Sequence, residues 1–187
     1  MSWGHAGAFG VGARNLVTLY PKSDLGIIIL SNAFPTGVPE GLSHSFADLV
    51  FDGKVEKDWV KAWDGIYESL IGPGVAAAKA AYAAPPASVT PALALVSYTG
   101  RYANAYVGDA VVASALVALT LTVGPGGART YALRHFDRDL FLYFPDPETP
   151  DKPSAVRFAV GADGKASAMT VESLDANGLG TLKRSNE

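Results

Sequence analysis

The start of the chain has the hydrophobic pattern of two β-strands joined by a turn. Between Gly7 and Tyr20 the odd positions are apolar, with Asn15 as the exception, and this alternation predicts a strand with one buried face. Pro21–Asp24 has the composition of a turn, because Pro pre-sets one backbone dihedral and Ser and Asp bond the local backbone. Leu25–Leu30 is a continuous apolar run, which is typical of a strand covered on both faces. We therefore expect an antiparallel hairpin whose second arm lies inside a larger sheet.

Two helices are predicted after the loop Asn32–Gly37. The first begins at Val38 and places its apolar positions on one face: Val38, Leu42, Phe46, Leu49 and Val50. The second follows Asp58, a suitable N-cap, and its aromatic residues recur at helical spacing: Trp59, Trp63 and Tyr67. We interpret this aromatic stripe as core packing rather than a ligand shelf. Gly72–Gly74 should break the helix, and the alanine-rich segment Val75–Ala84 resumes it.

The proline-rich segment Pro85–Pro91 marks the best domain boundary, since proline disfavours helix at and before its own position. Beyond it, about eight short segments of strand composition are divided by turn residues, including the pairs Asp163-Gly164 and Asn177-Gly178. The second and third segments run together without a Gly or Asp turn, so their register is open. The candidate strands are Tyr98–Ala105, Asp109–Ser114, Val117–Val123, Thr130–Arg134, Leu140–Phe144, Ala155–Val160, Ala166–Leu174 and Gly180–Lys183.

These elements predict an α+β chain: a truncated antiparallel sheet hairpin with helices over 1–84, a linker over 85–97, and a small all-β barrel of about eight strands over 98–187. The first region is incomplete by itself, because a doubly covered strand needs more neighbours than one hairpin supplies. Either another chain supplies these neighbours, or the sequence has lost an N-terminal portion. We expect the barrel to be filled by side chains rather than to enclose a ligand, with an interior lined by Tyr102, Leu119, Leu121, Phe141 and Phe158.

Composition excludes several classes of function. Hydrophobic residues make up 49% of the 187 residues and charged residues 18%, so a packed core is expected. The formal net charge of −3 gives no electrostatic reason to expect a nucleic acid partner. The chain has no cysteine, which excludes disulfides, thiolate metal sites and cysteine nucleophiles. No apolar run is long enough to span a membrane, and the N-terminus lacks the pattern of a signal peptide.

The N-terminal block carries the most specific chemistry in the sequence. Trp3–Gly10, followed by a strand, a short turn and Leu25–Ala33, resembles the third conserved block of serine hydrolases of the β-lactamase and penicillin-binding-protein type. That superfamily uses a Ser-x-x-Lys, a Tyr-x-Asn or Ser-x-Asn, and a Lys-Thr-Gly block. Many esterase and peptidase branches carry His-x-Gly in the third place, and His5-Ala6-Gly7 has this form.

The downstream part is similar to the small lipocalin-like domain that is often appended to these hydrolases. The similarity lies in Tyr98–Asn104, Tyr106–Gly108 and Leu133–Phe141. Two departures matter: the chain contains no Ser-x-x-Lys, and no Tyr-x-Asn precedes the third block. Tyr102-Ala103-Asn104 has that spelling but lies in the predicted barrel, and we interpret it as a barrel strand.

The resemblance implies hydrolysis of amide or ester bonds through an acyl-serine, and it implies roles for three residues. The backbone N–H of Ala8 would be one of two oxyanion donors, Gly7 would let a substrate approach the strand closely, and His5 would contact the substrate or tune the proton relay. Because the nucleophile is absent, we expect this chain alone to be inactive. A periplasmic or secreted location is compatible with the resemblance, and the sequence leaves localisation and substrate open.

The principal alternative is a non-catalytic binding or interaction module that uses the barrel. Under either interpretation the truncated sheet should seek a partner, either the absent catalytic half or a second copy bound through residues 1–35 or the first helices. No cofactor and no metal site are predicted. We interpret His44 as a polar position on the first helix and His135 as a solvated turn residue rather than a metal ligand.

Overall fold

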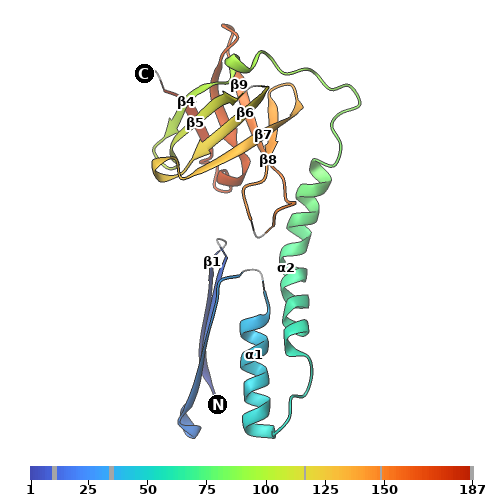
Figure 1. Cartoon of the computed structure of the whole chain (residues 1–187), viewed down its shortest axis with the longest axis vertical. Coiled ribbons are helices and arrows are strands. Elements are labelled where there is room, and N and C mark those ends of the chain that lie inside the picture. Colours follow the sequence, from blue (N-terminus) through green and yellow to red (C-terminus); the bar gives the residue numbers. More distant parts are fainter. Residues whose placement is uncertain (10–11, 34–35, 116, 148, 186–187) are drawn as a thin grey trace. The chain divides into compact units, whose positions relative to one another are not determined.

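The structure is a computed structural model of the chain (Figure 1), and it describes residues 1–9, 12–33, 36–115, 117–147 and 149–185. The chain divides into two compact units. The sheet unit comprises Met1–Ala77 and Asp146–Thr149, and the barrel unit comprises Ala78–Pro145 and Pro150–Glu187. A three-stranded sheet, two helices and a closed antiparallel barrel confirm the predicted α+β class.

The sheet unit contains an antiparallel meander in the order β1 (Trp3–Phe9), β2 (Ala13–Tyr20) and β3 (Leu25–Ser31). The prediction of a single strand over Gly7–Tyr20 was wrong, because this stretch includes the end of β1, a hairpin turn and the whole of β2. Gly12 is the turn residue directly before β2 and has a φ of 91°, which a glycine adopts without strain. Val11, counted in the predicted strand, lies outside the described residues.

The register explains why the turn is invisible in the alternation. Gly7 pairs with Asn15, and His5 pairs with Val17. Directly opposed residues point to the same face of a sheet, so the odd positions of both strands share one face. The period of two therefore continues through the hairpin unbroken, and hydrophobicity alone cannot locate the turn.

The odd face of the sheet is the uncovered one, contrary to the sequence prediction. Arg14 and Thr18 of β2 reach helix α1 (Val38–Ala47) through an ion pair and a hydroxyl contact, so the even face lies against the helix. On β3 the even positions belong to this face, because Ile28 pairs with Val17 and Leu30 pairs with Asn15. Ile28 is 70% exposed and Leu30 is 76% exposed. Among the described residues β3 has one neighbouring strand and one covered face. The apolar run of β3 is therefore covered on one face, whereas its composition predicts cover on both faces.

Helix α1 also turns its predicted apolar face outward. The exposed fraction is 39% for Val38 and 47% for Leu42, whereas Glu40, Gly41 and Ser43 are buried. The reason is close packing against the second helix: a Cβ added to Gly41 would lie 2.6 Å from the Cα of Val60. The chain continues after α1 as a short π-helical segment, η2 (Asp48–Asp52).

Helix α2 (Trp59–Ala81) runs through Pro73 without a break, so the predicted interruption at Gly72–Gly74 was wrong. Proline removes one backbone donor but can be accommodated as a local defect in a helix. The alanine-rich turns that follow are strong helix formers and favour continuation. The predicted N-cap is confirmed, because the backbone N–H of Lys61 donates to Asp58 Oδ1 at 2.9 Å.

The aromatic stripe of α2 packs against α1, but its three rings are half-buried rather than enclosed in a core as predicted. The Trp59 ring stacks on His44 with centroids 4.5 Å apart, and Trp63 lies 5.9 Å from the same ring. The Trp59 indole N–H donates to Asp48 at 2.6 Å. The backbone N–H of Glu56 and then this indole lower the pKa of the Asp48 carboxyl.

The barrel unit closes in the strand order β10-β11-β4-β5-β6-β7-β8-β9. The predicted segments correspond to these strands with small shifts at their ends, and the open register is settled by pairs from Ala110–Val123 to Ala115–Ala118. Gly164 and Gly178 have φ values of 74° and 72°, as tight turns require. The strands are β4 (Gly100–Asn104), β5 (Gly108–Ala115), β6 (Ala118–Val123), β7 (Arg129–Asp137), β8 (Leu140–Tyr143), β9 (Ser154–Val160), β10 (Ala166–Val171) and β11 (Thr181–Arg184).

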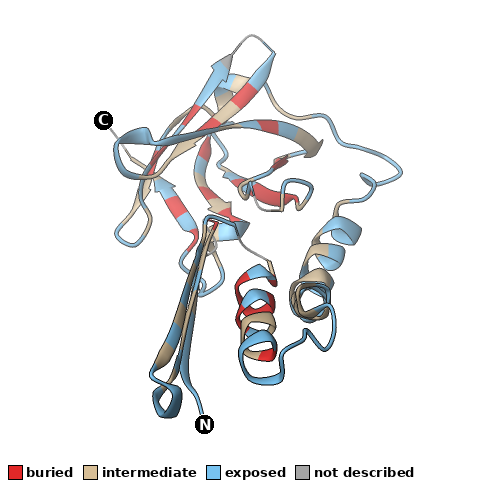
Figure 2. Ribbon diagram, turned by 60° about the horizontal axis from the view of Figure 1, so that its bottom comes forward, coloured by how far each residue is buried: buried red, intermediate tan, exposed pale blue. Residues whose placement is uncertain are grey.

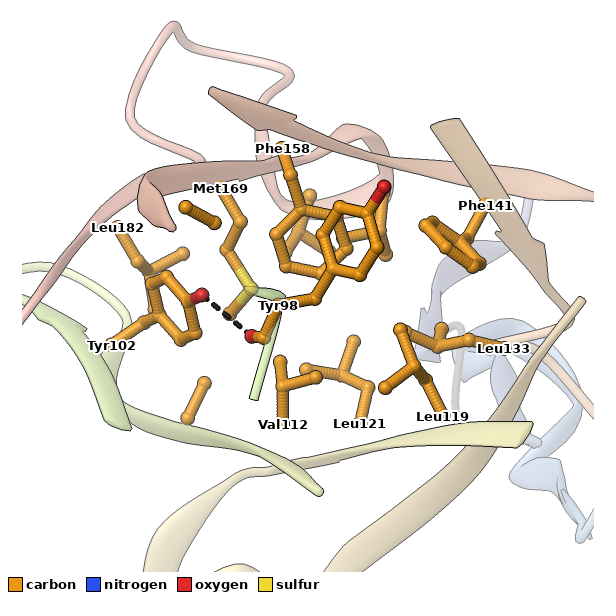
Figure 3. Close-up of a cluster of buried hydrophobic side chains, with 14 of the residues drawn as sticks. Tyr98, Tyr102, Val112, Leu119, Leu121, Leu133, Phe141, Phe158, Met169 and Leu182 are labelled. Carbon is orange, nitrogen blue, oxygen red and sulfur yellow. Dashed lines mark hydrogen bonds between the residues drawn. The ribbon is translucent and has the colours of Figure 1, made fainter. Parts of the chain in front are cut away.

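Side chains fill the barrel, as predicted (Figure 3). Tyr98 and Tyr102 are fully buried, and the Tyr102 hydroxyl donates to the Tyr98 carbonyl at 2.6 Å. Burial raises the pKa of each phenol to about 12. Arg184 of β11 donates to the carbonyls of Thr99 and Ser97 and to the Tyr102 hydroxyl, which ties the last strand to the first.

Candidate functional site

The predicted third-block residues lie on β1, at one edge of the sheet. His5 and Gly7 belong to the odd face, which nothing covers among the described residues. This face carries a shallow hollow of about 330 Å³. It is lined by His5, Gly7, Asn15, Leu16, Val17, Ile28 and Leu30. The structure thus brings His5 and Gly7 together in one open hollow on an apolar surface.

The packing of this chain does not require glycine at position 7. Gly7 does not have a positive φ, and a Cβ added there would meet only Asn15 Oδ1, at an ordinary 3.7 Å. Gly41, by contrast, is held against the backbone of a neighbouring helix. A glycine inside a strand costs stability, and it often marks a place where a ligand or another backbone comes close. The free space beside Gly7 is therefore available to something other than the described residues.

Asn15 is a residue of this hollow that the prediction did not include. It lies directly opposite Gly7 on β2, on the same face as His5, and it is exposed. Its signal in the sequence was the interruption of the apolar odd positions, and only the register places it beside Gly7. A carboxamide can both donate and accept hydrogen bonds, so this side chain adds polar recognition to an apolar hollow.

Ala8 lies opposite Arg14, near the end of β1. In the described residues β1 has one neighbouring strand, so alternate backbone N–H groups along it face an open edge. An open edge is what a backbone oxyanion donor needs. The role of the Ala8 N–H stays a prediction.

A buried polar network behind this strand pair was not predicted. Arg14 forms an ion pair with Glu40 of α1, and their side chains are 13% and 5% exposed. The Tyr67 hydroxyl donates to the same Glu40 oxygen at 3.1 Å, and burial, followed by the nearby Glu40 charge, raises its pKa. Thr18 Oγ1 lies 3.1 Å from Ser43 Oγ. This network holds the even face of β2 against both helices and so fixes the strand that faces β1.

The remaining histidines are not part of this site. His44 is exposed and stacked on the α2 aromatic stripe. His135 was predicted at a solvated turn, but it lies within β7, half-buried, with Nε2 3.1 Å from the Arg138 carbonyl. The turn comes later than predicted. β7 extends to Asp137, and the residue that follows, Arg138, has a φ of 45°.

No cluster of His, Cys, Asp or Glu suited to a metal ion occurs within the described part of the chain. Among the helices in those same residues, none combines the length and the hydropathy needed to cross a lipid bilayer.

Comparison with known proteins assigns the barrel region to a family. Residues 84–180 match the family model described as "Domain of unknown function (DUF3471)". A solved structure described as "Crystal structure of C-terminal domain of penicillin binding protein Rv0907" is 34% identical, covering 54% of this chain and 93% of that chain with a TM-score of 0.47. No curated protein matches the sequence.

Proposed function

Since this chain belongs to the family described as "Domain of unknown function (DUF3471)", a description that assigns no activity, we propose a function from its sheet unit. The sheet unit is the C-terminal part of a serine hydrolase domain of the β-lactamase and penicillin-binding-protein type. The intact domain cleaves amide or ester bonds through an acyl-serine. His5 and Gly7 line the substrate site, Ala8 supplies an oxyanion N–H, and the barrel is the appended C-terminal domain.

The observation that carries this proposal is the uncovered odd face of the sheet. Burying an apolar side chain contributes roughly 1.5–3 kcal/mol, and a free-standing sheet would forgo this at Ile28 and Leu30. The same face holds His5 and Gly7, so whatever covers the apolar part also borders the third-block residues. In the proposed domain, the segment with the Ser-x-x-Lys block takes this place.

The outer face of α1 and η2 also supports the proposal of a larger domain. Leu42 is 47% exposed and Leu49 is 56% exposed, although their helical spacing is that of a core stripe. The sheet and helix layer therefore has apolar residues on both outer sides. A layer of this kind is expected in the middle of a larger domain, between two further layers.

The proposal is tested with two proteins. The chain of 187 residues should not turn over a chromogenic β-lactam or p-nitrophenyl acetate, since it has no Ser-x-x-Lys. The coding DNA directly before Met1 is then read in frame for Ser-x-x-Lys and Tyr-x-Asn blocks. A protein extended to include them should hydrolyse one of the two substrates and become labelled on that serine by a fluorophosphonate probe.

Substitutions in the extended protein then test the site. His5→Ala should lower kcat/KM for the substrate that is turned over by at least tenfold, because His5 is placed in the hollow. His44→Ala is the matched control, since this exposed histidine lies on α1 away from the hollow, and it should leave kcat/KM unchanged. Upstream DNA without these blocks, or fluorophosphonate-sensitive turnover by the 187-residue chain, would refute the proposal.

The uncovered face also supports the proposal that the 187-residue chain self-associates when it is expressed alone. In the part of the chain that the structure describes, the sheet has two open edges and an exposed apolar face, and such surfaces are a known route to association. Light scattering that gives a monomer at high concentration would contradict this. The alternative function, a binding module, concerns the barrel; because its interior is filled, a ligand of such a module must bind at the barrel surface.

A further inference from the structure

We propose that the barrel unit binds a small apolar monocarboxylate in a groove at one end of the barrel, independently of the hydrolase proposal. The groove has a volume of about 630 Å³, within the range of small-molecule sites. Its apolar lining comes from the linker, β6, β7 and β8. These lining residues include Ala92, Leu95, Ala118, Ala132, Leu133 and Phe144.

The groove runs over the rim of the barrel wall rather than inside the barrel. Arg134 and His135 are consecutive on β7 and both line it, although successive strand residues point to opposite faces. Leu133 and Phe141 belong to the filled interior, and they lie near each other at one end of the core cluster in Figure 3. The apolar floor of the groove is therefore the end of a rigid core, which does not need to rearrange to receive a ligand.

Two exposed apolar side chains border the groove. Val117, between β5 and β6, is 91% exposed, and Phe144 is 43% exposed. Large apolar side chains that border a concave apolar surface mark a binding site more often than scattered exposed residues do. A ligand with an alkyl or aryl body would remove both side chains from water.

The charge at the groove selects an anion. Of the described residues that line the groove, Arg134 is the one with a permanent charge, and none is a carboxylate. Within the described residues, none of the ion pairs involves Arg134. A guanidinium binds a carboxylate through paired N–H donors, and a single cation matches a single negative charge. His135 contributes a fixed wall, because its Nε2 lies against the Arg138 carbonyl and its ring meets Phe141 edge-on at 5.3 Å.

The test compares decanoate with decanol on the full chain, by isothermal titration calorimetry and by amide chemical shifts in NMR. We expect saturable binding of decanoate below its micelle concentration, with shifts at Ala118 and Ala132, and weaker binding of decanol. Arg134→Gln should weaken decanoate binding by roughly fivefold, which is the scale of one exposed charge pair, and should leave decanol binding unchanged. Ala132→Phe should block both ligands, because it fills the groove from an exposed strand position.

Arg129→Gln is the matched control. Arg129 is exposed at the start of the same strand, it does not line the groove, and its loss changes the net charge equally. It should leave decanoate affinity unchanged. Equal affinity for decanoate and decanol, equal weakening by both arginine variants, or absence of decanoate binding would each overturn the proposal.

Discussion

The two units of this chain bury their apolar residues to very different extents. In Figure 2, buried residues recur along the barrel strands, whereas those of the sheet unit lie mostly on α1 and its strands are largely intermediate or exposed. In the barrel unit, Tyr98, Tyr102 and Leu119 are completely buried, and every strand has two neighbours. In the described residues of the sheet unit, the buried positions are glycines, Pro39 and polar residues such as Glu40 and Ser43. Its large apolar side chains, among them Ile28 and Leu30, are partly or largely exposed.

This difference teaches that the two units have different sources of stability. The barrel gains its stability from its own hydrophobic core, which is the dominant favourable contribution in folding. The sheet unit depends instead on a buried ion pair, glycine-mediated helix contacts and whatever covers its apolar faces. Because all three tryptophans, at positions 3, 59 and 63, lie in the sheet unit, tryptophan fluorescence reports that unit alone.

The largest expected effect is in the barrel core. Phe158 is 4% exposed and contacts the rings of Tyr98 and Phe141. Phe158→Ala should lower the free energy of barrel unfolding by about 3–5 kcal/mol, because it removes buried area and leaves a cavity. Urea unfolding followed by near-ultraviolet circular dichroism of tyrosine measures this. The tryptophan fluorescence transition should not move; a common shift of both signals would show that the units unfold together.

The next effect concerns the ion pair of the sheet unit. Arg14→Met should destabilise that unit by about 3 kcal/mol, since it leaves the Glu40 carboxylate buried without its cation. The double variant Arg14→Met/Glu40→Met should recover most of this loss, because no isolated charge then remains. Tryptophan fluorescence during urea unfolding is the measurement. A double variant that is less stable than Arg14→Met would contradict the argument.

A smaller effect is expected at alkaline pH, and it should involve the barrel. Burial raises the pKa of Tyr98 and Tyr102 from 10.0 to about 12. Above pH 10 the unfolded chain releases these protons while the folded barrel retains them. This contribution to stability is therefore complete below pH 10 and is lost as the pH rises to about 12. Tyrosinate absorbance should show late-titrating phenols whose ionisation coincides with loss of the tyrosine circular dichroism signal.

The smallest effect is expected on the uncovered face. Ile28→Thr/Leu30→Thr should change the stability of the isolated chain by no more than about 0.5 kcal/mol, because both side chains are already exposed to solvent. The same change should reduce self-association, measured by light scattering. A large loss of stability in the monomer would mean that this face is covered in solution by the chain itself.

Local pattern predicted the barrel well and the environment of the sheet poorly. The barrel strands follow from period-two segments and glycine turns such as Gly164, which are local signals. His5 and Gly7 were proposed from a motif, and that role stays a prediction; Asn15 was not predicted to lie beside them, because its position opposite Gly7 depends on strand register. The Arg14–Glu40 pair joins a strand to a helix that is distant in sequence, so no local spacing predicts this ion pair.

By itself the sequence determined the barrel strands, the starts of both helices and tight turns such as those at Gly164 and Gly178, because alternation, helical spacing and backbone preferences act over a few residues. Tertiary structure alone decided which face of each element is covered. Gly41 lets two helices meet, so α1 presents Glu40 and Ser43 inward and Leu42 outward. Tertiary structure also decided barrel closure, in which Tyr102 of β4 pairs with Arg184 of β11, the last strand of the barrel. Burial and long-range pairing depend on what packs nearby in space. A hydrophobic pattern indicates only that a residue should be covered, and it does not indicate which element covers it.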